Sequence, residues 1–316
     1  MKAAITGGTG FAEGRLAGRL DTAPSEARAQ AWIGWAPLAV LSLAAIALRA
    51  VLIPWAFTWL LAAAIFAGCK WQTWWEARAT KRARSWRRTA AYLLLWPGMD
   101  AEEFFETNVE KRRIEPREWL AALVKALAGV ALIWVGTRVV PSSHPLSAGW
   151  AGMVGLVLFL HFGMFHLIAL AWQCAGIHAE PIMQRPLESK SLSELWGKRW
   201  NLGFRKLSYS LVFRPLQRRF GAVAGTLGAF LASGLIHELV ISVPARAGYG
   251  LPTAYFLAQG LGVLAERSAA GKRLGLGHGM RGRLWAVLIA AGPLICLFHP
   301  WFVLRVMLPF VHAIGR

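Results

Sequence analysis

Residues 221–243 read GAVAGTLGAFLASGLIHELVISV, a stretch that is long and apolar enough to cross a lipid bilayer as a helix. It contains the ionisable pair His237-Glu238. Small residues, which permit close helix packing or leave space for a ligand, precede that pair at Gly225, Gly228, Ala229, Ala232, Ser233 and Gly234. Because ionisable side chains inside a span are costly, they usually face an interior cavity and mark function. The stretch therefore predicts a membrane helix with a polar site inside it.

Further apolar runs of similar length lie at 31–49, 51–69, 119–140, 149–173 and 284–310. Residues 252–265 form a shorter run that fits a tilted helix, and His299-Pro300 interrupts the last run. Residues 89–99 are too short to span, and Pro97 and Gly98 should stop any helix there. We predict an all-α polytopic membrane protein with about seven to eight transmembrane helices plus cytoplasmic amphipathic helices.

Composition agrees with that class of protein. The 316 residues are 56% hydrophobic and 16% charged, with 35 Lys and Arg against 16 Asp and Glu, a formal net charge of +19. A nucleic-acid-binding protein would explain the charge but not the apolar content. Of the 35 basic residues, 25 fall in four segments, at 70–88, 111–117, 185–219 and 267–283. Since positive charge collects on cytoplasmic loops, we expect an integral protein of the inner (cytoplasmic) membrane with its N-terminus in the cytoplasm.

The N-terminal residues suggest a second, weaker interpretation. MKAAITGGTGFAEG (1–14) resembles the nucleotide-binding start of a short-chain dehydrogenase. A Rossmann unit needs a second strand and an acidic residue further on, yet the first apolar span begins at residue 31. We therefore divide the chain into a cytoplasmic tail, 1–30, and a membrane-embedded domain, 31–316.

The segment before the first quoted stretch is basic and aromatic. Residues 188–219 read ESKSLSELWGKRWNLGFRKLSYSLVFRPLQRR. Trp196, Trp200, Phe204 and Leu207 recur at spacings of four, four and three, which predicts one apolar stripe on an interfacial amphipathic helix. Asn201 lies beside that stripe, where its amide can point into the protein.

His237 is the candidate general base, because a neutral imidazole can take a proton from a hydroxyl. The zinc-protease pattern HExxH fails, since the second histidine would be Ile241. From chemistry alone, a structural hydrogen bond between helices explains His237 equally well. His161 and His166, five residues apart, are poorly placed to share a face of an α-helix, and we expect them to line a tunnel or pack rather than to bind metal.

Several motifs together resemble the wax-synthase-like branch of the membrane-bound O-acyltransferase family. They are YLLLWPGMDAEEFF (92–105), PIMQRPLESKSL (181–192), SLSELWGKRWN (191–201), FRPL (213–216) and ASGLIHE (232–238). The resemblance implies a multi-helix membrane enzyme that moves an acyl group from acyl-CoA to a hydroxyl. It places the catalytic histidine at His237 and a second catalytic polar residue at Asn201.

The same resemblance implies acyl-CoA as co-substrate, a lipid or alcohol acceptor, contact with membrane lipids, and no cofactor, metal or nucleic acid. Candidate substrate-binding residues are Trp196, Arg199, Trp200, Ser233 and Glu238. Glu238 points about 100° away from His237 on a helix, which favours a structural acid over a proton relay. Basic residues after Asn201 are candidates for contact with the CoA phosphates, namely Arg205, Lys206, Arg214, Arg218 and Arg219.

Two other functions stay open at this point. One is transfer to a different hydroxyl, on a glycan or a small molecule. The other is a transporter or lipid-binding membrane protein without chemistry, which should show paired broken helices in corresponding halves. We find no such repeat in the sequence. Long-chain alcohol esterification is the first expectation.

Overall fold

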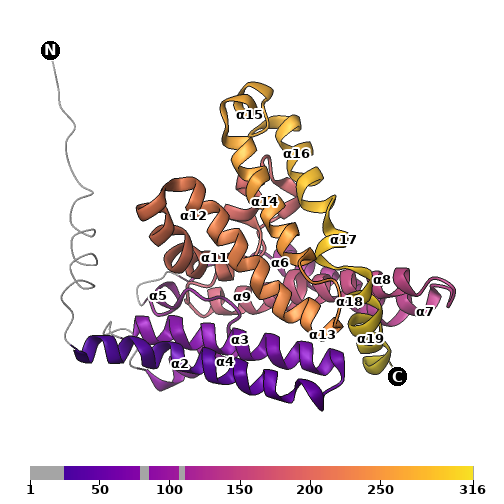
Figure 1. The fold of residues 1–316 in the computed structure, drawn as a ribbon. Coiled ribbons are helices and arrows are strands. Elements are labelled where there is room, and N and C mark those ends of the chain that lie inside the picture. Colours follow the sequence, from indigo (N-terminus) through magenta and orange to yellow (C-terminus); the bar gives the residue numbers. More distant parts are fainter. Residues whose placement is uncertain (1–24, 79–84, 107–110, 316) are drawn as a thin grey trace.

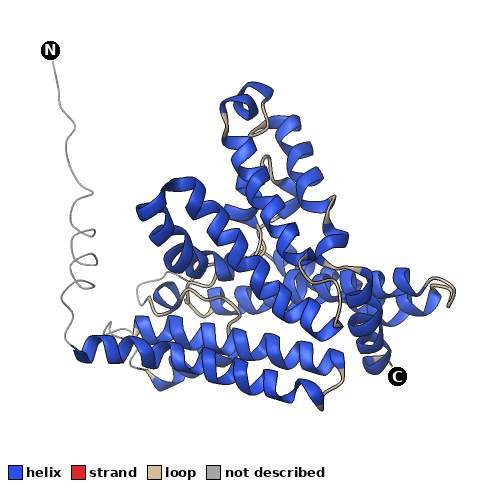
Figure 2. Cartoon of the chain, viewed as in Figure 1, coloured by secondary structure: helices blue, strands red, loops and turns tan. Residues whose placement is uncertain are grey.

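A computed structural model describes residues 25–78, 85–106 and 111–315. The regular structure of these residues consists of helices joined by loops, with no strand among them (Figure 2). The expected all-α class is confirmed. The N-terminal glycine motif and most of the predicted tail lie outside the described residues.

The N-terminal helices form a layer along one side of the molecule (Figure 1). Its two long helices, which pack lengthwise against each other, are α2 (Ser25–Ala47) and α3 (Pro54–Ala77). They are followed by α4 (Trp86–Leu95) and α5 (Ala101–Phe104). Helix α4 ends just before Pro97, as predicted. The buried Lys70 of α3 donates to the Gly98 carbonyl and lies 3.4 Å from the centre of the Tyr92 ring, which ties α3 to the loop after α4.

A helical hairpin lies against this layer. Its first arm comprises α6 (Pro116–Ala131), η3 (Leu132–Gly136) and α7 (Thr137–Val139). Its second arm comprises α8 (Pro145–Val157), the π-helical η4 (Leu158–Met164) and α9 (Phe165–Cys174). The arms approach closely, because a Cβ atom at Gly129 would lie 2.6 Å from the Gly155 carbonyl oxygen.

The central segment is more broken than the sequence suggests. It comprises α10 (Leu192–Glu194), η6 (Leu195–Arg199), α11 (Leu202–Ser208), η7 (Tyr209–Phe213), α12 (Arg214–His237), η8 (Glu238–Ser242) and α13 (Val243–Ala245). The predicted continuous amphipathic helix is wrong, because the chain is extended at Trp200 and left-handed at Asn201. Trp196 and Trp200 line a cavity, whereas Phe204 packs on Phe66 of α3 with ring centres 6.5 Å apart.

Gly221 forms the turn of a second helical hairpin. It has φ 85° and ψ 172°, a backbone conformation that only glycine adopts readily. The chain folds back there, so α12 packs against η7. The small residues after the turn serve close packing, as the sequence predicts: a Cβ atom at Gly225 would lie 2.9 Å from the Phe213 carbonyl oxygen, and one at Gly234 would lie 2.8 Å from the Thr253 Cα atom.

The C-terminal part packs against α12 and the α6–α9 hairpin. It comprises α14 (Leu251–Arg267), α15 (Ala269–Leu274), α16 (Gly279–Ala291), α17 (Leu294–Leu297), α18 (Pro300–Phe302), η9 (Val303–Met307) and α19 (Leu308–Ile314). Helices α14 and α16 form an upright pair with α15 at its tip (Figure 1). The chain breaks at His299-Pro300, as predicted.

Five helical stretches among the described residues are long and apolar enough to cross a membrane. They are Trp32–Ala50, Pro116–Val139, Pro145–Cys174, Leu202–Ala245 and Gly279–Leu297. The sequence predicts about seven to eight spans. The difference arises because α3 combines its apolar run with Lys70 and several Trp residues, α14 has 17 residues, and Pro300–Ile314 is a separate short helix.

Candidate active site

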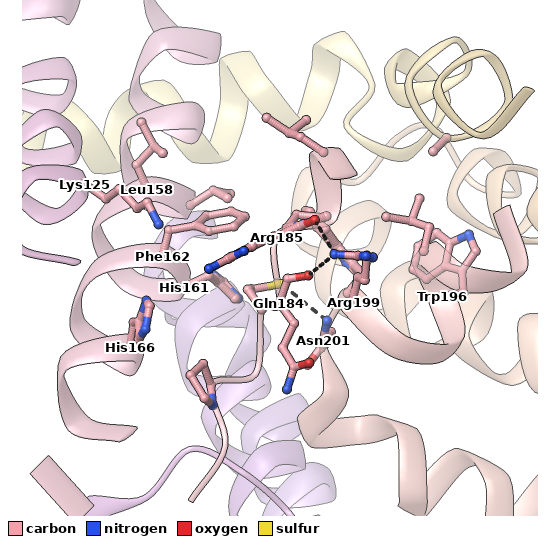
Figure 3. A pocket seen from close by; sticks show the side chains of 18 of the residues that line it. Lys125, Leu158, His161, Phe162, His166, Gln184, Arg185, Trp196, Arg199 and Asn201 are labelled. Carbon is pink, nitrogen blue, oxygen red and sulfur yellow. Dashed lines mark hydrogen bonds between the residues drawn. The ribbon is translucent and has the colours of Figure 1, made fainter. Parts of the chain in front are cut away.

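A cavity of about 2280 Å³ lies among the α6–α9 hairpin, the central segment and helices α14 and α16–α18. Five of the seven predicted site residues line it, namely Trp196, Arg199, Trp200, Asn201 and His237. These residues come from the two ends of the central segment, which the Gly221 hairpin brings together. Figure 3 shows the part of the wall around Asn201 and Arg199.

His237 is the last residue of α12 and is half-buried, with its ring on the cavity wall. Its Nδ1 atom lies 2.7 Å from the carbonyl oxygen of Ser233, one turn earlier. A carbonyl only accepts, so Nδ1 must carry the proton. In the neutral ring, Nε2 then holds the free lone pair, which is the arrangement a general base needs. The ring also packs on Phe256, with centres 4.4 Å apart.

Asn201 occupies the turn between η6 and α11. Its φ of 46° and ψ of 53° are left-handed, a conformation that asparagine tolerates better than most residues. Its backbone N–H donates to the sulfur of Met183 at 3.3 Å, and the next N–H, of Leu202, donates to the Ile182 carbonyl at 2.9 Å. The turn is therefore fixed against the 182–183 segment, and the Asn201 side chain stays on the cavity wall.

The two tryptophans make an aromatic wall. Trp196 donates from Nε1 to Gln259 Oε1 at 3.2 Å, and Gln259 in turn donates to the Ile289 carbonyl at 2.6 Å. The Trp196 ring contacts Phe256, the same ring that supports His237. Trp200 meets Phe162 of η4 edge-on at 6.4 Å.

Arg199 is held by the protein itself. Its Nε donates to Glu194 Oε1 at 2.7 Å, and its NH1 donates to the carbonyls of Gln184 and Arg185 at 3.3 and 3.2 Å (Figure 3). The backbone N–H of Lys190, with help from Arg199, lowers the pKa of Glu194 below its usual range. Arg199 therefore clamps the 184–185 segment to α10, and this role occupies most of its donors.

Ser233 and Glu238 lie away from the described cavity wall. Ser233 contributes its backbone carbonyl to His237. Glu238 accepts from the N–H groups of Gly250 at 2.8 Å and Thr253 at 3.3 Å, and from the Thr253 hydroxyl at 3.0 Å. These are the free donors at the start of α14, so the carboxylate caps that helix. The geometry gives neither side chain a substrate-binding role.

Among the polar residues of the wall that were not predicted as site residues are Lys125 of α6, His161 of η4 and His166 of α9. Both histidines line the cavity, which agrees with the expectation that they line a tunnel or pack. The expectation that they share no helix face assumes α-helical geometry, whereas residues 158–164 form a π-helix, in which hydrogen bonds join residues five apart. Its position inside the apolar run 119–140 is the sequence signal by which Lys125 could have been found.

Two of the basic residues considered for CoA phosphates are engaged within the protein. Arg205 donates to the Gly197 carbonyl at 2.9 Å, and Lys206 contacts Asp100 and Glu102, each at 2.8 Å. The described residues contain no group of three or more His, Cys, Asp or Glu side chains arranged to hold a metal ion.

Comparison with known proteins gives a family match over part of the chain. Residues 179–258 match the model of the "Membrane bound O-acyl transferase family". Among similar curated proteins of Arabidopsis thaliana, "Probable long-chain-alcohol O-fatty-acyltransferase 1" is 38% identical over 73 residues, 21% of each chain. "Probable long-chain-alcohol O-fatty-acyltransferase 3" is 30% identical over 122 residues, 35% of this chain and 36% of that protein.

A third relative, "Acyl-CoA--sterol O-acyltransferase 1" of the same plant, is 30% identical over 86 residues, 23% of this chain and 25% of that protein. The chain thus spans between about a fifth and about a third of the length of these relatives. The O-acyl transferase segment contains all seven predicted site residues, whereas Lys125, His161 and His166 lie outside residues 179–258. The family match and the five apolar helices support an integral membrane protein.

Proposed function

We propose that this protein is an acyl-CoA-dependent O-acyltransferase whose acceptor is a long-chain alcohol, so that its product is a wax ester. One observation carries the proposal: the free Nε2 lone pair of His237 belongs to a ring on the wall of the same cavity as Asn201. The matches to alcohol and sterol acyltransferases support it.

In the proposed reaction, Nε2 of His237 takes the proton of the acceptor hydroxyl. The oxygen attacks the thioester carbonyl carbon, the carbon–sulfur bond breaks, and CoA leaves as a thiolate that regains a proton. The ester stays in the cavity as product. A thioester is already activated, so this route needs no metal and no further cofactor.

Asn201 is proposed to donate from its side-chain amide to the oxyanion that forms on the thioester carbonyl. Such a donor is worth about 10²–10³ in rate. Its fixed turn favours this role, because oxyanion donors act through preorganisation. Trp196 and Trp200 are proposed to pack along the acyl chain, while Arg199 holds the wall in place.

The access route is part of the proposal. Helix α12 starts again at Ala222 after the Gly221 turn, so His237 lies about 15 × 1.5 ≈ 22 Å along it. That is deep in a hydrocarbon core of about 30 Å. We place the N-terminus and the basic loops in the cytoplasm, where acyl-CoA is dissolved, and the alcohol enters from the bilayer.

The direct test uses membranes that contain the wild type, His237→Ala or His312→Ala, supplied with labelled acyl-CoA and hexadecanol. His312 is an exposed histidine of α19 that does not line the cavity, so it is the matched control. We expect ester from the wild type and His312→Ala, and a loss of at least about a hundredfold in His237→Ala.

Equal ester formation by wild type and His237→Ala would remove His237 as the base. A panel of hexadecanol, a sterol and a short alcohol, with product identification, tests the acceptor. Esterification of a different acceptor would replace the long-chain alcohol in the proposal, and no ester with any acceptor would remove the enzyme assignment.

A further inference from the structure

Lys125 stands out among the cations of the cavity. Five Lys and Arg residues line its described wall. The four arginines pair with carboxylates: Arg112 with Glu118 at 3.0 Å, Arg117 with Glu115 at 2.5 Å, Arg185 with Glu188 at 3.7 Å, and Arg199 with Glu194 at 2.7 Å. Within the described part of the chain, Lys125 has neither an ion-pair partner nor a hydrogen-bond acceptor.

The position of Lys125 within an apolar helix makes the lack of a partner energetically costly. It lies nine residues into α6 from Pro116, about 14 Å along a helix that is apolar enough to span a membrane. Lys125 is half-buried on the cavity wall, and an ammonium group in an apolar span is stabilised by an anion, an oxygen acceptor or cavity water. The protein supplies no carboxylate for it among the described residues.

Two histidines extend the same polar wall. His166 lies within electrostatic reach of Lys125, and His161 has a buried Nδ1 atom with no hydrogen-bond partner among the described residues. In Figure 3, Lys125, His161 and His166 project from the helices on one side of the cavity, with Gln184, Arg199 and Asn201 across from them. His161 belongs to the π-helix η4, and His166 lies at the start of the following helix, α9.

We propose that Lys125, His166 and His161 form a second polar subsite, which binds an oxyanion or a strongly accepting oxygen of a ligand. The subsite deepens the proposed function and rests on it, since it concerns the polar part of a substrate whose reacting group lies at His237. The chemistry of the three residues suits such a group, because they supply one cation and two imidazoles that can each donate a hydrogen bond.

Two sources can provide that oxygen group. One is the polar arm of the thioester donor, which carries amide carbonyls and phosphates. The other is an acceptor that carries a second polar group besides its reacting hydroxyl, which a simple alcohol such as hexadecanol does not. The chemistry at the subsite is the same in both, and steady-state kinetics separates them, because each source predicts a rise in KM for a different substrate.

The experiment compares Lys125→Met, Lys125→Arg and His166→Gln with the wild type and with Lys272→Met. Lys272 is an exposed lysine of α15 outside the cavity wall, and its substitution by methionine removes the same charge. We expect Lys125→Met to raise the KM of one substrate about tenfold, with kcat within about twofold, because a charged hydrogen bond is lost. Lys125→Arg should restore most of the affinity, and Lys272→Met should behave as wild type.

The donor is then supplied either as full acyl-CoA or as a truncated acyl thioester of N-acetylcysteamine. If the subsite holds the donor arm, the tenfold effect appears with acyl-CoA and disappears with the truncated donor. If it holds a second polar group of the acceptor, the KM of an alkanediol acceptor rises with both donors, whereas the KM of hexadecanol does not change. Unchanged KM values for both substrates in Lys125→Met and His166→Gln would overturn the proposal.

Equilibrium binding separates this proposal from the enzymatic one. Purified wild type and Lys125→Met are titrated with CoA and with hexadecyl phosphate, neither of which needs turnover. Binding that weakens about tenfold in Lys125→Met supports the subsite even if no ester is formed, in which case only the proposed function fails. Equal binding of both probes by the two proteins would overturn the subsite even if ester is formed.

Discussion

The rings of His237 and Phe256 pack together with their centres 4.4 Å apart, and the same Phe256 ring contacts Trp196 at 5.9 Å. Phe256 therefore links the last residue of α12 to the aromatic wall of η6, although it belongs to neither element. It is buried, and it lies on α14. The direction of the His237 ring depends on this contact as well as on its hydrogen bond to Ser233.

The first prediction concerns Phe256→Leu. We expect kcat for ester formation to fall about tenfold, because a less constrained imidazole spends less time in the productive geometry. The KM for acyl-CoA should change little. The measurement is steady-state kinetics with hexadecanol, alongside the Tm of the purified protein. A loss of activity that follows only from unfolding would instead show a large fall in Tm.

The second prediction separates the side chain of Asn201 from its backbone. Asn201→Gly keeps a residue that adopts left-handed φ freely but removes the amide. We expect kcat to fall about 10²–10³-fold with little change in Tm. Asn201→Ala should lose the same activity and also about 1 kcal/mol of unfolding free energy, because alanine is strained at φ 46°.

If Asn201→Gly retains full activity, the amide has no role in the reaction, and the residue serves the turn alone. Thermal unfolding in detergent and initial rates measured on the same preparations decide between these outcomes.

The third prediction concerns Glu238→Gln. The carboxylate caps α14 through Gly250 and Thr253, so we expect a loss of about 1 kcal/mol of unfolding free energy, with the KM values unchanged. A substrate-binding role for Glu238 predicts the opposite: a raised KM and an unchanged Tm. Thermal unfolding and kinetics on one preparation distinguish the two roles.

The fourth prediction is a pH dependence of stability at Glu194. Its pKa is lowered in the folded protein by the Lys190 N–H and by Arg199, so the unfolded chain binds a proton more readily. The interaction stabilises the fold fully above the ordinary pKa of about 4.5 and is lost as pH falls through the lower, folded value. Glu194→Gln should therefore have a lower Tm than the wild type at pH 7. At acid pH the difference in Tm between the two proteins should become smaller. A difference that does not depend on pH would contradict this.

Local sequence determined much of the architecture. Apolar runs, the Pro97-Gly98 stop and the His299-Pro300 break predicted helices and boundaries that the structure contains, because hydropathy and proline geometry act over a few residues. An ionisable pair in a span pointed to His237 for the same local reason: charge in an apolar segment is costly wherever the segment lies.

Only the tertiary structure decided what each polar group faces. Arg199 pairs with Glu194, Glu238 caps a helix that begins at residue 251, and no carboxylate of the described residues pairs with Lys125. The π-helix η4 changes the helical register ahead of His166, and His161 and His166 both line the cavity. Contacts between residues far apart in the chain follow from packing between helices, and so does a change of helical register. No spacing rule within one helix contains that information.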